Sequence, residues 1–218
     1  WAQKYQDVKF HLIARDHDKL NLVSTDLKVK YPSVSTVSYI VDALNTEQLT
    51  KTLDDICQLG HIDLCFMAQG IMYLDENTLS DAQIDRLIQL NCSSIAASTD
   101  HIYKHMQKQG SGKIAVIGSV AGDRGRKANY LYGASKAFVA TYIKGLQHKI
   151  ALNQENIHAC LIKPGPTESE MTAHLVAQGK KLAPVQDVAK IIVDGIEKNS
   201  ATIYAPKIWR IIMLVIQH

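Results

Sequence analysis

Six short runs of strand-forming residues, several of them apolar, alternate with longer stretches of helical periodicity along the chain. These runs cover 8–14, 34–41, 62–68, 113–118, 157–163 and 201–204. The helical stretches cover 19–30, 47–59, 81–109, 131–153 and 185–198. Fully apolar strands that alternate with helices form a parallel sheet that is covered on both faces. We therefore predict a doubly wound α/β fold with three layers, helix on sheet on helix.

Composition agrees with one domain that covers 1–218. The 218 residues are 46% hydrophobic and 21% charged, and we find no internal repeat, low-complexity segment or linker. A net charge of +3 is too small to indicate a nucleic-acid partner. No pair of cysteines has CxxC spacing, so we interpret the four cysteines as reduced thiols of a cytoplasmic protein. They are Cys57, Cys65, Cys92 and Cys160.

A tyrosine and a lysine four positions apart, Tyr132 and Lys136, lie on one face of the expected helix. A free phenol has a pKa of about 10, and a nearby positive charge favours its ionised form. Ser119 follows the apolar run at 113–118, where it can hold a substrate oxygen beside the phenol. This order of strand, Gly-Ser turn, loop and helix makes Tyr132 a candidate acid and base.

Over 8–205 this arrangement resembles the classical short-chain dehydrogenase/reductase family. The resemblance implies that Ser119 orients a carbonyl or alcohol, and that Tyr132 is the acid and base. It implies that Lys136 lowers the pKa of the tyrosine and holds the nicotinamide ribose. Asn91 matches the asparagine that the family uses to hold a helix kink and a proton-relay water. The Tyr-Gly-Ala-Ser-Lys helix start and the Gly-Ser turn are the motifs behind this assignment.

The same resemblance assigns residues to an NAD(P) cofactor. Asp42 matches an aspartate that faces the adenine amino group. Met67-Ala-Gln-Gly70 stands where the family has Asn-Asn-Ala-Gly, so both asparagines are absent and only backbone contacts with the adenine ribose are expected there. A Pro-Gly turn at 164–165 matches the turn that contacts the nicotinamide amide. The full expected set is Arg15, Asp42, Ala68, Gly70, Tyr132, Lys136, Pro164, Gly165, Thr167 and Ser169.

The end of the first apolar run indicates the form of the cofactor. An acidic side chain there would accept hydrogen bonds from the ribose 2′-OH, whereas a basic one would pair with a 2′-phosphate. Ala14 fills the usual position of the acid and Arg15 follows it, although Asp16 stands beside the arginine. We therefore favour NADP, with NAD as the alternative.

The N-terminal part departs from the family pattern. A dinucleotide fold needs a first strand and a glycine-rich turn, and nothing before position 8 supplies either. In the family this strand lies between the strands expected at 8–14 and 62–68, where its loss would leave buried backbone groups unpaired. We expect the printed sequence to start one strand, turn and helix after the natural N-terminus. A fragment that lacks cofactor binding is the alternative.

Two further patterns concern metals and membranes. His101 and His105 have a spacing that can hold zinc, but no third ligand is apparent, so we expect surface or interface histidines and no metal site. The apolar run 203–216 contains Lys207 and Arg210 and is shorter than the about 20 residues that span a bilayer. We expect it to pack over the substrate pocket or between subunits, with peripheral membrane contact as the alternative.

The helical stretches 81–109 and 131–153 contain more apolar residues than one sheet face requires. We expect these two helices to pair with the same helices of a second subunit in a two-fold contact, giving a dimer or a tetramer, with ordinary core residues as the alternative. The residues concerned are Ile95, Ile102, Met106, Phe138, Tyr142 and Leu146.

The sequence thus predicts an NAD(P)-dependent oxidoreductase that moves hydride between nicotinamide and a small carbonyl or alcohol compound. An epimerase or dehydratase with the same Tyr–Lys pair is one alternative. A regulatory protein that senses the dinucleotide without turnover is another, although it would not require an acid and base. The segment 168–184 is expected to form a mobile lid over the substrate, and its variability on a common scaffold leaves the substrate unidentified.

Overall fold

The computed structural model describes residues 1–217 of the chain. The chain divides into two compact units, Trp1–His61 and Ile62–His218. All six expected strands are present in the described part, and their ends lie within two residues of the expected ones. The α/β class that the alternating pattern predicts is confirmed.

The first unit is a pair of parallel strands, each followed by a helix. β1 (Lys9–Ala14) pairs in register with β2 (Ser35–Ile40). The helices are α1 (His17–Lys30) and α2 (Thr46–Gln58). Each helix begins where a side-chain oxygen accepts a backbone N–H of the first turn, from Asp16 in α1 and from Asn45 in α2. These caps fix where the chain leaves each strand.

The second unit contains a four-stranded parallel sheet in the order β3-β4-β5-β6. The strands are β3 (Leu64–Met67), β4 (Gly112–Ile117), β5 (Ile157–Pro164) and β6 (Thr202–Ala205). Consecutive residues in the two central strands are fully buried, so both faces of the sheet are covered. They include Ile114, Ala115, Val116, Leu161 and Ile162.

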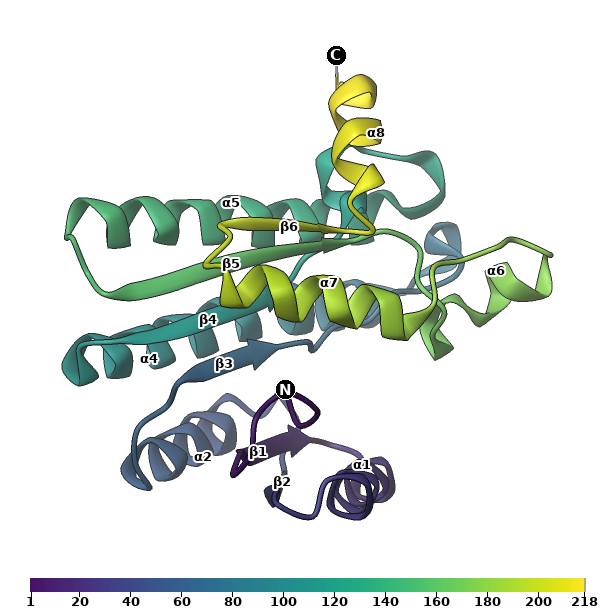
Figure 1. The fold of residues 1–218 in the computed structure, drawn as a ribbon. Helices are drawn as coiled ribbons and strands as arrows, with labels where there is room; N and C mark the ends of the chain where they lie inside the picture. The colour runs from purple at the N-terminus through teal and green to yellow at the C-terminus, as the bar shows by residue number, and fades with distance from the viewer. Residues whose placement is uncertain (218) are drawn as a thin grey trace. The chain divides into compact units, whose positions relative to one another are not determined.

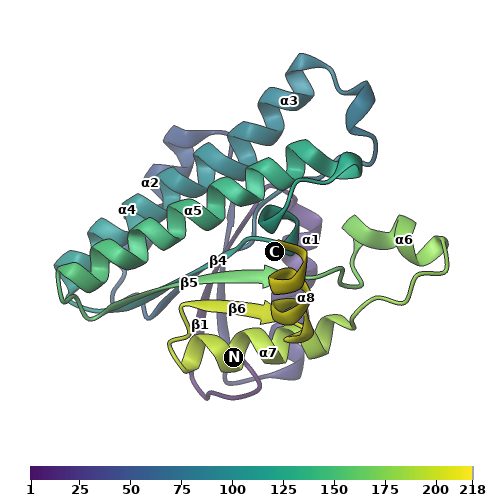
Figure 2. The same ribbon diagram turned by 90° about the horizontal axis from the view of Figure 1, so that it is seen from above.

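Helices cover this sheet from both sides, as Figures 1 and 2 show. α4 (Ser94–Gln109) and α5 (Tyr130–Leu152) lie on one face, and α7 (Val185–Glu197) lies on the other. The short α6 (Ala173–Ala177) extends away from the sheet. α8 (Ile208–Gln217) follows the end of β6. Helices on both faces of a parallel sheet complete the three layers that the sequence predicts.

The long helix expected at 81–109 is interrupted. It divides into α3 (Asp81–Ile88), a π-helical turn η2 (Gln89–Ser93) and α4. A π turn contains one extra residue, which displaces the ladder of hydrogen bonds and often marks a functional site. The turn contains the completely buried Asn91.

Most of the apolar residues that we assigned to a subunit contact belong instead to the core of the single chain. Ile95, Ile102, Met106 and Leu146 are at most 8% exposed, because a helix that lies on a sheet buries about half its surface. Phe138 differs, since 43% of its surface is exposed. It stacks on the ring of Tyr142, with 6.1 Å between ring centroids.

α8 comprises most of the C-terminal apolar run. Met213 points inward and is 1% exposed, whereas more than half of the surface of its outward apolar residues is exposed. These are Ile208, Ile211, Leu214 and Val215. Among residues 1–217, no helix has both the length and the apolar character that crossing a membrane requires.

Candidate active site

Ser119 stands directly after the central strand β4. The backbone N–H of Gly118 donates to the carbonyl of Ile162 at 2.7 Å, so the sheet pairing continues past the end of β4. Ser119 then adopts an extended backbone and begins the 3₁₀ helix η3 (Val120–Asp123). Its Oγ accepts the backbone N–H of Ala121 at 3.1 Å. This bond fixes the side chain at the carboxyl edge of the sheet.

Two glycines let η3 lie directly on α5. A Cβ at Gly122 would come within 2.6 Å of the carbonyl carbon of Lys136, and a Cβ at Gly133 would lie 2.9 Å from the carbonyl oxygen of Ala121. Real Cβ atoms essentially never approach other atoms so closely, so only glycine fits at 122 without a shift of the backbone. The contact brings the hydroxyl of Ser119 close enough to the phenol of Tyr132 to affect its pKa.

Tyr132 is almost completely buried in the first turn of α5, at 9% exposure. Burial raises the pKa of its phenol, and the hydrogen bond with Ser119 opposes that effect. The family resemblance implies the opposite direction, a pKa lowered by Lys136. The lysine Nζ lies 5.7 Å from the centre of the tyrosine ring and donates to the carbonyl of Ile117 at 3.1 Å. The phenol therefore has Ser119 as its stabilising neighbour.

Lys136 is 3% exposed, and burial lowers the pKa of its amine to about 8, with a weaker opposing effect from Cys92. Its Nζ has three hydrogens, of which the bond to Ile117 uses one. A Cβ at Gly70 would lie 3.4 Å from this Nζ and 3.3 Å from Oδ1 of Asn91, so the backbone of Gly70 adjoins both groups. The other two hydrogens of the Lys136 ammonium, beside the backbone of Gly70, could donate to the hydroxyl groups of a ribose.

Asn91 joins the loop after β3 to α5. Its Nδ2 donates to the carbonyl of Ile71 at 2.9 Å and to Oγ of Ser135 at 3.0 Å. Its Oδ1 accepts the backbone N–H of Ile71 at 2.8 Å. Ser135 in turn donates to the carbonyl of Tyr132 at 2.8 Å. The π turn thus directs an amide at the helix that contains the tyrosine and the lysine.

Glu76 is a site residue that the sequence did not reveal. It is 4% exposed, in the 3₁₀ helix η1 (Glu76–Thr78). Its two carboxylate oxygens accept the backbone N–H groups of Leu131 and Tyr132, at 2.7 and 2.8 Å. Asn129, which directly precedes α5, provides no side-chain cap. Glu76 therefore caps α5 from a distant part of the chain, whereas sequence patterns locate caps only beside the helix.

The Pro-Gly turn after β5 packs against α8. A Cβ at Gly165 would lie 1.9 Å from Nε1 of Trp209, so the indole covers that side of the glycine. Thr167 Oγ1 donates to the carbonyl of Gly165 at 3.0 Å, and Oγ of Ser169 lies 3.1 Å from Oγ1 of Thr172. These hydroxyls thus form local bonds within the turn. The C-terminal run therefore packs against the Pro-Gly turn through Trp209.

The segment 168–184, expected as a lid, contains short helices. They are η5 (Glu170–Thr172) and α6, and a parallel bridge between Thr167 and Ala183 joins the two ends of the segment. Met171 and Val176 in this segment expose 39% and 50% of their surfaces. This segment therefore presents apolar side chains on a closed loop.

The remaining expected cofactor residues stand at strand ends. In the first unit, Arg15 follows β1 and is exposed. Asp42 follows β2, and its Oδ1 accepts the backbone N–H of Leu44 at 3.0 Å. In the second unit, Ala68 directly follows β3 and is exposed. The carboxyl end of a parallel strand is the usual edge for a dinucleotide.

Comparison with known proteins agrees with this arrangement. A family model described as short chain dehydrogenase matches residues 4–180. An uncharacterized oxidoreductase of Staphylococcus haemolyticus is 28% identical over 199 residues, which cover 88% of this chain and 81% of the relative. The structure of a short-chain dehydrogenase from Sphingobium yanoikuyae in complex with NADPH superposes with a TM-score of 0.80 and 20% identity, covering 91% of this chain and 78% of that one. A 3-oxoacyl-[acyl-carrier protein] reductase from Brucella melitensis in complex with NAD has a TM-score of 0.76 and 19% identity, with 90% and 85% covered.

Proposed function

The chain belongs to the short-chain dehydrogenase family of oxidoreductases, and from this premise we propose that it transfers hydride between a nicotinamide dinucleotide and a small carbonyl or alcohol compound. The observation that supports this most directly is the backbone contact of η3 with α5. It places Ser119 in hydrogen-bond reach of Tyr132. Protonation of a carbonyl oxygen requires a proton donor and a second hydroxyl that are held in fixed positions beside that oxygen.

Ser119 and Tyr132 would have different roles toward the substrate oxygen: Ser119 would hold it, and Tyr132 would protonate it. The Oγ of Ser119 accepts the N–H of Ala121, and its single hydrogen can turn from the phenol of Tyr132 to the substrate oxygen. In reduction Tyr132 gives its proton to the oxygen, and in oxidation it takes the proton back. Burial keeps the phenol protonated near neutral pH, which suits the reductive direction.

Lys136 would hold the cofactor. Its two unused Nζ hydrogens can donate to the hydroxyls of the nicotinamide ribose, next to the backbone of Gly70. When bound, the dinucleotide supplies or accepts the hydride, and the protein supplies the position and the proton. With a pKa of about 8, the amine can exchange a proton in the neutral range. Asn91 would keep the loop that contains Gly70 in place through its bonds to Ile71.

We favour NADP as the cofactor because of Arg15. The first unit has this cation directly after β1 and no acidic side chain at position 14. A guanidinium can pair with the 2′-phosphate through two parallel hydrogen bonds. One structural neighbour is in complex with NADPH and the other with NAD, so this preference rests on the arginine alone.

The proposal is tested by following the absorbance of NADPH and NADH with a panel of carbonyl compounds and the natural full-length protein. Tyr132→Phe should abolish turnover with every compound that the unmodified protein reduces. Cofactor affinity, measured by fluorescence, should change by no more than about tenfold, because the phenol makes at most one bond to the cofactor.

Tyr142→Phe is the matched control. It removes a phenol hydroxyl from the same helix, one that donates to the carbonyl of Ala96, and turnover should persist. Near-normal kcat in Tyr132→Phe would refute the assigned acid and base. Binding of a dinucleotide without turnover of any compound would instead favour a sensor.

A further inference from the structure

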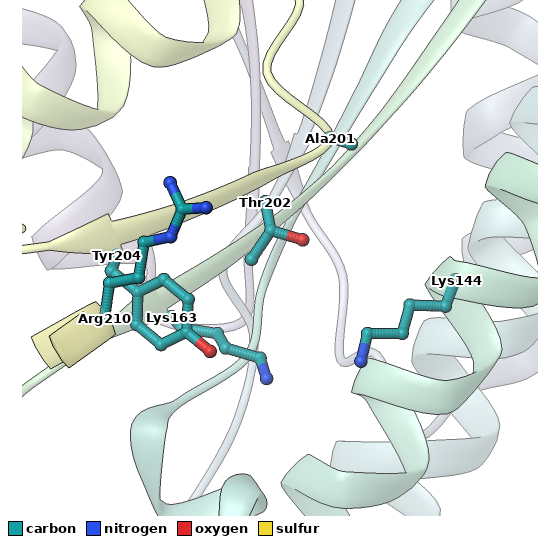
Figure 3. A pocket seen from close by; sticks show the side chains of 6 residues that line it. All are labelled: Lys144, Lys163, Ala201, Thr202, Tyr204 and Arg210. Carbon is teal, nitrogen blue, oxygen red and sulfur yellow. The ribbon is translucent and has the colours of Figure 1, made fainter. Parts of the chain in front are cut away.

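A pocket of about 350 Å³ opens in the second unit between β5, β6, α5 and α8 (Figure 3). Three cationic side chains from three different elements line it, together with one hydroxyl from β6 and one phenol. The lining residues are Lys144, Lys163, Ala201, Thr202, Tyr204 and Arg210. The ammonium groups of Lys144 and Lys163 point toward each other across the pocket. None of these residues has a part in the proposed reaction.

One of the three cations is already neutralised. Lys163 forms a buried ion pair with Asp123, whose side chain is 3% exposed, and the hydroxyl of Tyr204 donates to the same carboxylate at 3.2 Å. Burial raises the pKa of Tyr204 to about 12, and the charge of Asp123 adds to this effect. The phenol therefore stays protonated, and the group of Lys163, Asp123 and Tyr204 has no net charge.

The other two cations are not compensated. Among residues 1–217, neither Lys144 nor Arg210 forms an ion pair with a carboxylate. Three positive charges less the one negative charge of Asp123 leave two positive charges at the pocket. The hydroxyl of Thr202, from β6, adds a neutral hydrogen-bond donor to the lining of the pocket. The site is thus complementary to an anion with two charges.

We propose that this pocket binds the phosphate group of a phosphomonoester. A phosphomonoester has a charge of about −1.5 to −2 at neutral pH, which matches the pocket, whereas a single carboxylate would leave one cation without a partner. Its oxygens match a guanidinium in geometry and a lysine ammonium as a point charge. The volume is at the lower end of the roughly 300–1,000 Å³ typical of ligand sites, so a few further atoms fit beside the phosphate.

The phosphate can belong to a soluble ester or to a lipid. The lipid source has a structural basis, because Arg210 belongs to α8, whose outward face exposes Ile211 and Leu214. The same charges recognise the phosphate in both sources. The two are therefore separated by experiment.

The direct test is calorimetric titration of the full-length protein with inorganic phosphate and with glycerol 3-phosphate. Saturable binding is expected, and added salt should weaken it. Lys144→Ala and Arg210→Ala should each raise the dissociation constant by about tenfold, as expected for the loss of one charge-assisted hydrogen bond. Lys144→Arg should retain binding. Both positions are exposed, so the fold should tolerate these changes.

Lys190→Ala is the matched control, because it removes one exposed lysine from α7, on the other face of the sheet. A second arm uses sedimentation with phosphatidylcholine vesicles, with and without phosphatidic acid. Capture only by phosphatidic acid, lost in Lys144→Ala, would support the lipid source. The proposal is overturned if none of the three probes binds, or if Lys190→Ala weakens binding as much as Lys144→Ala does.

Discussion

The carboxylate of Glu76 accepts the backbone N–H of Tyr132 at 2.8 Å, across 56 positions of sequence. The same carboxylate accepts the N–H of Leu131. Both groups belong to the first turn of α5, whose N–H groups have no partner within the helix. A negative charge at this end also interacts favourably with the helix dipole. The proposed acid and base is therefore held by its backbone as well as by its packing.

Glu76→Ala should lower the free energy of unfolding by about 2 kcal/mol, because two buried N–H groups lose their acceptor. It should also lower kcat, since the first turn that contains Tyr132 becomes less ordered. Glu76→Gln retains one acceptor oxygen and should lose less in both measurements. Urea unfolding and steady-state kinetics are the measurements. Glu47→Ala, in the exposed first turn of α2, is the control. Equal effects of the two alanine variants would contradict the capping role.

The buried amine of Lys136 should make stability depend on pH. Its pKa is about 8 in the folded protein and 10.5 ordinarily, so between these values the unfolded chain binds a proton that the folded chain lacks. The free energy of unfolding should therefore rise with pH across this window, by at most about 1.4 kcal/mol per pH unit and about 3 kcal/mol in total. Above a pH of about 9, cysteines with raised pKa, above all Cys160, oppose the rise, and above about 10 tyrosines such as Tyr132 and Tyr204 oppose it as well.

Urea unfolding at several values between about pH 8 and 9 measures this slope. Lys136→Met should abolish it. Lys144→Met, which removes an exposed lysine from the same helix, should leave it unchanged. An unmodified protein with no rise in this range would show that Lys136 is hydrated in solution.

Arg15 should set the preference between the two cofactors. The full-length protein should bind NADPH more tightly than NADH, and Arg15→Ala should reduce this preference by about tenfold, since Arg15 is exposed and its pairing is partly screened. Affinity for NADH, which lacks the 2′-phosphate, should not change and serves as the internal control. Fluorescence titration measures both. Equal affinities in the unmodified protein would leave the choice of NADP without support.

Phe138 should contribute to self-association. It is 43% exposed on α5 and stacks on Tyr142, so the pair presents an aromatic surface to a second copy of the chain. Phe138→Asp should convert a dimer or tetramer into monomers, as measured by light scattering at micromolar concentration. Leu22→Asp, at an exposed apolar position of α1, should not. If the unmodified protein were strictly monomeric and active, a subunit contact at Phe138 would be contradicted.

The elements that sequence predicts well are those that depend on local periodicity. The two central strands β4 and β5 follow from apolar runs, because a strand buried on both faces contains little else, and the other four follow from short runs of strand-forming residues. The positions of Ser119, Tyr132 and Lys136 follow from their order along one strand, turn and helix. Such features need no knowledge of the rest of the chain.

What the sequence did not provide depends on contacts between distant segments. The interruption at Asn91 follows only from the family resemblance, because a π turn has no periodicity of its own. Glu76 resembles an ordinary loop residue until the chain folds back on α5. The direction of the pKa of Tyr132 depends on burial, which spacing does not encode. Ile95 and Met106 could be read as interface or core, and only the packed structure distinguishes these.

The close backbone contact at Gly122 and Gly133 has a consequence for protein engineering. The approach of η3 to α5 is set by main-chain atoms, so side-chain changes away from this contact and from the cap at Glu76 should leave it unaltered. The segment 168–184, which we expect to contact the substrate, contains neither glycine and can be varied in a library without changing this backbone contact. Positions 122 and 133 should be held invariant in such a library.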